Sequence, residues 1–307
     1  MGLKNYLKRM RQRILWATGI PQEVGQIVLQ TLKTDFQSSY VDRGTQLLLA
    51  IKFRENFEKS HRLSDFDEIE FRNYSQNGED GILCYIFSLI GTVNKRCVEI
   101  CAGNGTQCNC ANLIINHGWT GLLFDGNEGN IKDGQQYFKK HPDTFTYPPK
   151  LIHAWITAEN VNDIIISNGT NGEIDLLSLD IDGVDYWIWN AIEAVYPRVV
   201  VAEIQAIWGC ESSLTVPYRS DFKAEFVNGF GVYSGASLPA FVKLGKKKGY
   251  RLVGCQRYGF NAFFVRNDVG QDIFPEITAE RCFSHPFALW AHDVLLPMVK
   301  NREWQEV

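Results

Sequence analysis

From about residue 96, the chain alternates short apolar runs with segments of helix length, and this alternation restricts the fold more than any single motif. Five runs are rich in Val, Ile and Leu, at residues 96–100, 121–125, 150–156, 175–181 and 198–204. The intervening segments are long enough for helices, at residues 107–117, 128–140, 158–168 and 184–195. Near-continuous hydrophobic strands joined by helices are typical of a parallel sheet covered on both faces. The pattern predicts a doubly wound α/β fold.

Two more apolar runs follow, at residues 251–255 and 261–266, after a helical segment at residues 236–250. The pentapeptide QRYGF is all that separates them. This connection is too short for a parallel crossover, so the two strands should be antiparallel neighbours. We therefore predict a seven-stranded, mostly parallel sheet with one reversed strand.

The chain outside this sheet forms two predicted extensions. Residues 1–70 show helical periodicity and no strand pattern, so we expect a helical N-terminal extension that caps the domain or makes it a homo-oligomer. Residues 271–307 are rich in aromatic side chains and are expected to pack on the domain formed by residues 71–270. Residues 1–20 carry basic side chains at helical spacing and no acidic one. This stretch fits either peripheral contact with the inner membrane or packing on the protein itself or on a partner.

Composition excludes several classes of function. The net charge of −4 lacks the basic surplus of a nucleic-acid-binding protein, so we expect no nucleic-acid partner. The eight cysteines fall mostly inside apolar runs, and no secretory signal is evident, which is typical of reduced thiols in a cytoplasmic protein. No stretch is apolar enough to predict a transmembrane helix.

The first strand ends in the sequence EICAGNG, beside the position where ligands bind in open α/β sheets. Gly103 and Gly105 allow the backbone to approach a ligand, and we expect Glu99 and Cys101 on the same segment to contact that ligand as well. Asp125 ends the second strand and is placed to accept both hydroxyls of a ribose, although it also fits a turn residue that caps the next helix.

A dinucleotide site needs a third glycine for close packing around a pyrophosphate, but Cys108 occupies that position. Cys101 stands where the first glycine of an ExGxGxG pattern would be. The pattern therefore favours a ligand with a ribose and an amino-acid end but no pyrophosphate. S-adenosylmethionine meets these requirements.

Several motifs in order resemble the FkbM-type family of S-adenosylmethionine-dependent methyltransferases. They are YSQNGEDGIL, VEICAGNGTQCNCANLI, GWTGLLFDG, LLSLDIDGVDYWIW and VVVAEIQ, and the resemblance covers about residues 71–270. It implies the Rossmann-like sheet of class I methyltransferases and O-methylation of sugar or polyketide hydroxyls. It also implies that the segment with Gln76 closes over the cofactor and that Trp155, Ile156 and Thr157 hold the adenine. Helix capping is the alternative role for the segment at Gln76 and for Thr157.

Carboxylates gather where the fourth and fifth strands end. Asp180, Asp182 and Asp185 follow the fourth strand, and Glu203 ends the fifth. Carboxylates this close need a cation, protons or hydrogen-bond donors to offset their repulsion. We expect Asp180, Asp182 and Glu203 to hold Mg²⁺, with Asp180 also touching the cofactor. The alternatives are a general base at Asp182 or Glu203 and helix-capping roles for Asp182 and Asp185.

Together these features predict an S-adenosylmethionine-dependent O-methyltransferase in the cytoplasm. The family resemblance implies a sugar or glycan acceptor, in a bacterial surface polysaccharide or another glycoconjugate. An O-methyltransferase of small secondary metabolites would keep the same mechanism. Gly103, Gly105 and Asp125 would also fit two other kinds of protein, an NAD-dependent oxidoreductase and a non-catalytic scaffold that binds a nucleoside.

Overall fold

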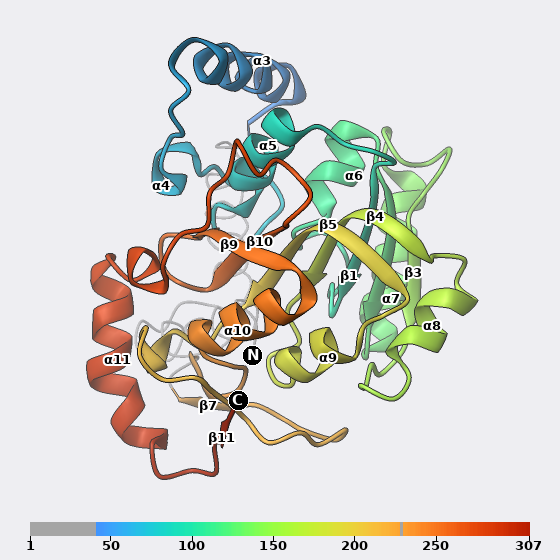
Figure 1. Cartoon of the computed structure of the whole chain (residues 1–307). Helices are drawn as coiled ribbons and strands as arrows, with labels where there is room; N and C mark the ends of the chain where they lie inside the picture. Colours follow the sequence, from blue (N-terminus) through green and yellow to red (C-terminus); the bar gives the residue numbers. More distant parts are fainter. Residues whose placement is uncertain (1–40, 228–229) are drawn as a thin grey trace, which may run out of the picture.

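A seven-stranded sheet forms the centre of the computed structural model, which describes residues 41–227 and 230–307 (Figure 1). The order is β3-β2-β1-β4-β5-β10-β9. Its strands are β1 (Arg96–Ile100), β2 (Thr120–Asp125), β3 (Lys150–His153), β4 (Gly172–Leu179), β5 (Val195–Glu203), β9 (Tyr250–Cys255) and β10 (Asn261–Arg266). Neighbouring strands are parallel except β10, which is antiparallel to both β5 and β9. The predicted fold class is confirmed, including the single reversed strand.

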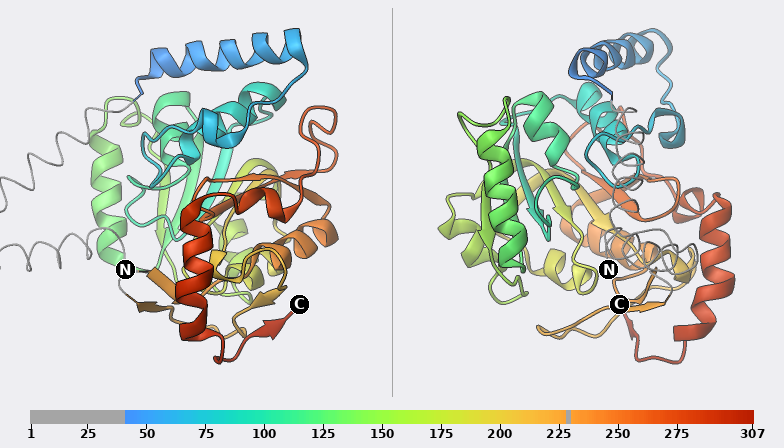
Figure 2. Two further views of the ribbon diagram at one scale, coloured as in Figure 1. Left: turned by 90° about the vertical axis from the view of Figure 1, so that its left-hand side faces the viewer. Right: turned by 180° about the vertical axis from the view of Figure 1, so that it is seen from behind.

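Helices cover both faces of the sheet (Figure 2). On one face α5 (Glu79–Ile90), α6 (Ala111–His117) and α7 (Glu128–Lys140) share a core with Cys97 and Leu123 of the strands. On the other face α8 (Val161–Ser167), α9 (Asp185–Ala191) and α10 (Leu238–Lys248) share a core with Val98 and Phe124. Successive strand residues point to opposite faces, and here both faces are buried. This explains why the strands read as continuous apolar runs.

Three helices are shorter than the sequence predicts. Helix α6 begins at Ala111 because residues 101–110 form the bend described below. Helix α8 begins at Val161 with Asn160 as its N-cap, so Thr157 precedes the cap rather than forming it. Helix α9 ends at Ala191, and the chain is already extended at the next residue.

The N-terminal extension is helical over the described residues. Helix α3 (Arg43–Ser60) contacts α5, and the short α4 (Phe66–Ile69) follows it (Figure 1). Residues 1–40, which include the basic stretch at residues 1–20, lie outside the described residues. No helix among those described has the length and hydropathy that a bilayer crossing requires.

An insertion between β5 and α10 contains strands that the sequence did not reveal. It comprises η1 (Ala206–Trp208), β6 (Leu214–Thr215), β7 (Glu225–Val227) and β8 (Phe230–Tyr233). The C-terminal residues form η2 (Ala279–Cys282), α11 (Pro286–Val299) and β11 (Gln305–Glu306). Strand β11 pairs with β6, and α11 contacts η1 and β8. The C-terminal extension therefore lies against the insertion, while the domain limits at residues 71 and 270 stay predictions.

Candidate functional site

The candidate site lies at the carboxyl ends of the parallel strands. The strand order reverses between β1 and β4, and ligands of open α/β sheets bind at this point. The strands stay hydrogen-bonded to their ends, because the Ala102 N–H donates to the Phe124 carbonyl at 2.8 Å and the Asp180 N–H to the Ile100 carbonyl at 3.4 Å. The chain leaves β1, β2 and β4 side by side, which brings the predicted residues to one edge.

The two glycines of the bend have different surroundings. Both have left-handed backbones, with φ +61° at Gly103 and +73° at Gly105. A Cβ atom at Gly103 would meet nothing within 4 Å, whereas one at Gly105 would lie 2.8 Å from Cε2 of Phe138. Gly103 therefore faces open space where a ligand can approach. Gly105 instead lets the bend pack against α7.

Glu99 is buried at the end of β1 and binds the protein's own backbone. Its carboxylate accepts hydrogen bonds from the N–H groups of Asn109 at 2.9 Å and Cys110 at 2.8 Å. The hydroxyl of Ser178 donates to it as well, at 3.1 Å. Glu99 therefore anchors the start of α6 to the sheet, and its predicted contact with the cofactor stays a prediction.

Asp125 joins β2 to the glycine bend. Its Oδ2 accepts the Gly103 N–H at 2.9 Å, and its Oδ1 accepts the Asn127 N–H at 2.8 Å and the Asn130 side-chain amide at 3.0 Å. The N-cap of α7 is Asn127, so Asp125 supports that cap rather than forming it. A carboxylate oxygen can accept more than one hydrogen bond, which leaves capacity at Oδ2 for a ligand hydroxyl.

The loop after β3 places an indole beside this carboxylate. Trp155 is 54% exposed, and its ring lies over Gly126, where an added Cβ would come within 3.0 Å of Cε3. The indole N–H donates to the Ser220 carbonyl at 2.7 Å, which links the loop to the insertion. Ile156 is buried, and Thr157 is half-buried. Of the three predicted adenine contacts, Trp155 presents the largest free surface.

Three of the predicted carboxylates meet after β4 and β5. Oxygen atoms of Asp180, Asp182 and Glu203 all lie within 4.8 Å of one another. Asp185 is buried and accepts the N–H groups of Ile181 at 2.7 Å and of Gly183 at 3.0 Å. These bonds close a tight turn in which Asp182 has a left-handed backbone, with φ +56°. Asp185 thus shapes the turn that brings Asp182 to the cluster.

Burial and mutual repulsion dominate the electrostatics of the cluster. Loss of solvation, followed by repulsion from the neighbouring carboxylates, raises the pKa values of Asp180 and Glu203 well above their usual range. Burial, followed by the charges of Asp180 and Asp125, raises the pKa of the Cys101 thiol. No ion pair between described residues involves the three clustered carboxylates. At neutral pH the cluster therefore requires protons or a cation.

Asn261 also lies at this edge, and sequence reasoning missed it. It is the first residue of β10 and stands directly opposite Glu203 in the strand register. Its side-chain amide donates to the buried Glu79 at 3.0 Å. The predicted reversal of this strand could have revealed Asn261 as a site residue. The first residue of an antiparallel strand lies beside the last residue of its neighbour, which here is Glu203. Gln76, predicted to contact the cofactor, is exposed on the segment before α5.

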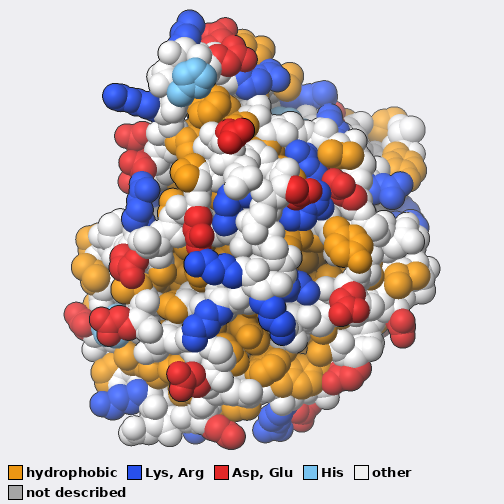
Figure 3. Space-filling model, viewed as in Figure 1, with side chains coloured by type: hydrophobic (Ala, Val, Ile, Leu, Met, Phe, Trp, Pro, Cys, Tyr) orange, Lys and Arg blue, Asp and Glu red, His pale blue; other side chains and the backbone are white. Residues whose placement is uncertain are grey.

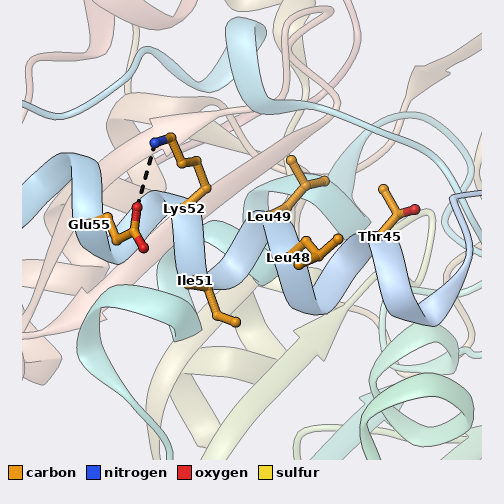
Figure 4. Close-up of a pocket in the computed structure, with 6 residues that line it drawn as sticks. All are labelled: Thr45, Leu48, Leu49, Ile51, Lys52 and Glu55. Carbon is orange, nitrogen blue, oxygen red and sulfur yellow. Dashed lines mark ion pairs between the residues drawn. The ribbon is translucent and has the colours of Figure 1, made fainter.

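A hollow elsewhere on the surface is separate from this edge. A hollow of about 390 Å³ runs along α3, and its lining residues belong to that one helix: Thr45, Leu48, Leu49, Ile51, Lys52 and Glu55 (Figure 4). It contains none of the predicted site residues. Basic and acidic side chains are interspersed over the face shown in Figure 3.

No family model and no curated protein matches the sequence. Among solved structures, the methyltransferase domain of bacterial CtHen1 gives a TM-score of 0.40 at 11% identity, covering 61% of this chain and 97% of that one. The glycopeptide N-methyltransferase MtfA with S-adenosylmethionine gives 0.38 at 9% identity, covering 66% and 90%. The N-terminal domain of EvdMO1 with SAH bound gives 0.38 at 13% identity, covering 74% and 97%. These are partial likenesses at low identity, and they assign no family to this chain.

Proposed function

We propose that this protein transfers a methyl group from S-adenosylmethionine to a hydroxyl group, on a sugar of a surface polysaccharide or another glycoconjugate. The observation that carries the proposal is the edge where β1, β2, β4 and β5 end. Gly103 leaves open space there, the Asp125 carboxylate lies against the glycine bend, and the acidic cluster follows β4 and β5. The sugar acceptor rests on the family resemblance of the sequence. A small-metabolite acceptor would leave the rest of the proposal unchanged.

The start of α6 argues against a dinucleotide. A pyrophosphate in this fold binds the free N–H groups at the start of the helix after β1. Here the N–H groups of Asn109 and Cys110 already donate to Glu99. A pyrophosphate would have to displace a buried carboxylate that makes short hydrogen bonds to both. A donor with an amino-acid end makes no such demand, which favours S-adenosylmethionine over NAD.

The cofactor is expected to lie along the edge from the glycine bend to the loop after β3. Gly103 leaves room for the amino-acid end, Asp125 can accept a ribose hydroxyl, and the exposed indole of Trp155 can cover the adenine. The sulfonium methyl would then point towards Asp180 and Asp182. In this arrangement the exposed Cys101 lies beside the cofactor, with its Sγ 4.0 Å from Oδ2 of Asp125.

The acidic cluster supplies the chemistry at the acceptor. A hydroxyl must lose its proton as the methyl group arrives. A divalent cation such as Mg²⁺ fits three carboxylates of this spacing, and when bound it lowers the pKa of a hydroxyl. Asp180, Asp182 and Glu203 would hold that cation, and without a cation Asp182 or Glu203 would take the proton as general base. Burial, followed by the charges of the neighbouring carboxylates, raises the pKa of Glu203, and burial raises that of Asp182, which favours proton uptake by both groups.

Calorimetry with S-adenosylmethionine, S-adenosylhomocysteine and NAD tests the cofactor. We expect the first two to bind and NAD not to bind. Asp125→Asn should weaken both by about 10-fold or more, because it removes a charged hydrogen-bond acceptor. Asp133→Asn on the exposed surface of α7 is the matched control. Binding of NAD alone would refute the proposal, and transfer of label from the donor to candidate glycans would establish turnover.

A further inference from the structure

The side chain of Asn261 contains a buried oxygen atom without a hydrogen-bond partner among the described residues. The side chain is 6% exposed, and its amide nitrogen donates to Oε1 of Glu79 at 3.0 Å. The unpaired atom is therefore Oδ1. Buried polar atoms are nearly always paired in native proteins, so an orphaned oxygen calls for a ligand.

Asn261 lies next to a residue of the acidic cluster. Asn261 and Glu203 are direct partners in the antiparallel pair of β10 and β5. Residues directly opposite each other in such a pair project to the same face, with Cβ atoms about 5 Å apart. Glu203 in turn has a carboxylate oxygen within 4.8 Å of oxygens from Asp180 and Asp182.

Glu79 determines which end of the Asn261 amide is left unpaired. A carboxylate accepts hydrogen bonds and repels a carbonyl oxygen, so the amide must turn its nitrogen towards Glu79. Glu79 is held in place by the N–H of Asn77 at 3.0 Å. The amide oxygen is therefore left on the side away from Glu79, and rotation of the amide would bring two acceptors together.

We propose that Asn261 supplies a fourth oxygen ligand, through Oδ1, to a divalent cation bound by Asp180, Asp182 and Glu203, and that Glu79 orients this ligand. The inference rests on the cation named in the proposed function and adds the neutral ligand and its positioning residue. Hard divalent cations bind carboxylate and amide oxygens together. A neutral ligand completes the site without adding a fourth negative charge to three that already repel one another.

Titration of the full chain with Mn²⁺ alone, followed by electron paramagnetic resonance of the free ion, tests the site without any donor or acceptor. We expect one bound Mn²⁺ per chain. Asn261→Ala should weaken binding about 10-fold or more, because it removes the neutral ligand. Asn261→Asp should not restore full affinity, because it adds a fourth negative charge and loses the N–H that donates to Glu79. Glu79→Gln should weaken binding about 10-fold, because the loss of an orienting partner commonly costs 10–100-fold in affinity.

Asn73 provides a matched control. It is also buried, its amide nitrogen donates to Asn112 at 2.9 Å, and its Oδ1 likewise has no partner among the described residues. It lies outside the acidic cluster, so Asn73→Ala should lower stability to a similar degree and leave Mn²⁺ affinity unchanged. Equal Mn²⁺ affinity in Asn261→Ala and the natural protein would overturn the proposal, as would equal weakening in the Asn73 and Asn261 variants.

Calorimetry with S-adenosylmethionine on the same samples separates the two proposals. If the donor binds and methyl transfer proceeds in a chelator while Mn²⁺ does not bind, the cation site is refuted and the methyltransferase stands. If Mn²⁺ binds in an Asn261-dependent way while the donor does not bind, the proposed function is refuted and the cation site stands.

Discussion

At the scale of single residues, Gly103 and Gly105 should respond differently to the same substitution. Gly103→Ala adds only the strain of a left-handed alanine, about 1 kcal/mol, because its Cβ meets no atom within 4 Å. Gly105→Ala adds the same strain and a clash with Phe138. It should therefore lower the free energy of unfolding by about 1–3 kcal/mol more than Gly103→Ala does. Urea denaturation of the two variants measures the difference.

The two alanine variants should rank in the opposite order for donor affinity, with Gly103→Ala the more strongly affected. Gly103→Ala places a methyl group in the space where the amino-acid end is expected, so it should weaken S-adenosylmethionine binding more than Gly105→Ala does. Gly105→Ser provides a second variant of the packed position. If the two alanine variants lose equal stability and equal donor affinity, the division of roles between these glycines is wrong.

Some site residues could be predicted from the sequence, and others could not. Asp180, Asp182 and Glu203 were expected together because the carboxyl ends of adjacent parallel strands share an edge, and the structure brings them together. The partners of Glu99 were not predictable in this way. They are N–H groups in a loop whose path depends on three-dimensional packing, and no side-chain pattern marks them.

At the scale of elements, a buried polar network joins α3 to α6. Gln46 of α3 and Asn112 of α6 exchange hydrogen bonds at 3.2 and 2.9 Å, and Nε2 of His117 lies 2.7 Å from Oε1 of Gln46. The amide oxygen of Gln46 is an acceptor, so His117 must donate and needs no positive charge to do so. Apolar periodicity cannot reveal such a contact, because all three residues are polar.

His117 should make the docking of α3 sensitive to acid. Burial, followed by the positive charges of Lys95 and Arg43, lowers its pKa from 6.5 to about 4. Between these values the unfolded chain binds more protons, so the stabilising contribution is complete above pH 6.5 and is lost as the pH falls towards 4. His117→Gln removes the titration. The stability advantage of the natural protein over this variant should fall by about 2 kcal/mol between pH 7 and pH 4.5.

Denaturation of both proteins across this pH range is the measurement. The comparison matters because burial also raises the pKa of Asp80 to about 6, which favours the folded state as the pH falls. That contribution is common to both proteins and cancels in the difference. A difference in stability that does not change with pH would show that His117 titrates normally.

At the scale of the whole molecule, the C-terminal residues support the insertion that borders the site. The ring of Trp304 lies 5.0 Å from that of Trp208 and 5.1 Å from that of Tyr233, measured between centroids. Tyr233 in turn packs near Phe222, which covers Gly183 beside Asp182. A chain of aromatic contacts thus connects the end of the sequence to the turn that holds the acidic cluster.

Trp304→Ala should lower the free energy of unfolding by about 2 kcal/mol, because the indole is only partly buried. Because the aromatic chain ends at the turn that holds Asp182, we expect the insertion to border the acceptor. The variant should therefore raise the KM for the acceptor more than it weakens donor binding, which the insertion reaches through Ser220 and Trp155. Trp304→Phe keeps the ring contacts and serves as the control. Thermal unfolding, acceptor kinetics and donor calorimetry check these effects. A loss of donor affinity larger than the rise in KM would contradict the expected place of the insertion beside the acceptor.

All seven strands of the sheet could be predicted from the sequence, whereas the strands of the insertion could not. The inner strands appear as continuous apolar runs because both of their faces are buried, and the edge strand β3 keeps a shorter apolar centre. Strand β6 has two residues and pairs with β11, which lies 90 positions later, so neither carries a local pattern. Short strands whose partners are distant in sequence depend on tertiary contacts that no window of residues contains.

Because β10 lies between β5 and β9, synthesis leaves β5 without its outer neighbour until residues 250–266 have left the ribosome. Until then one long edge of a hydrophobic strand has unpaired N–H and carbonyl groups, which favours aggregation. Any shortened version that stops after β5 would expose that edge permanently. Chaperone capture of nascent chains should accordingly concentrate on the lengths at which β5 has left the ribosome and β10 has not, and solubility should return once the closing hairpin is complete.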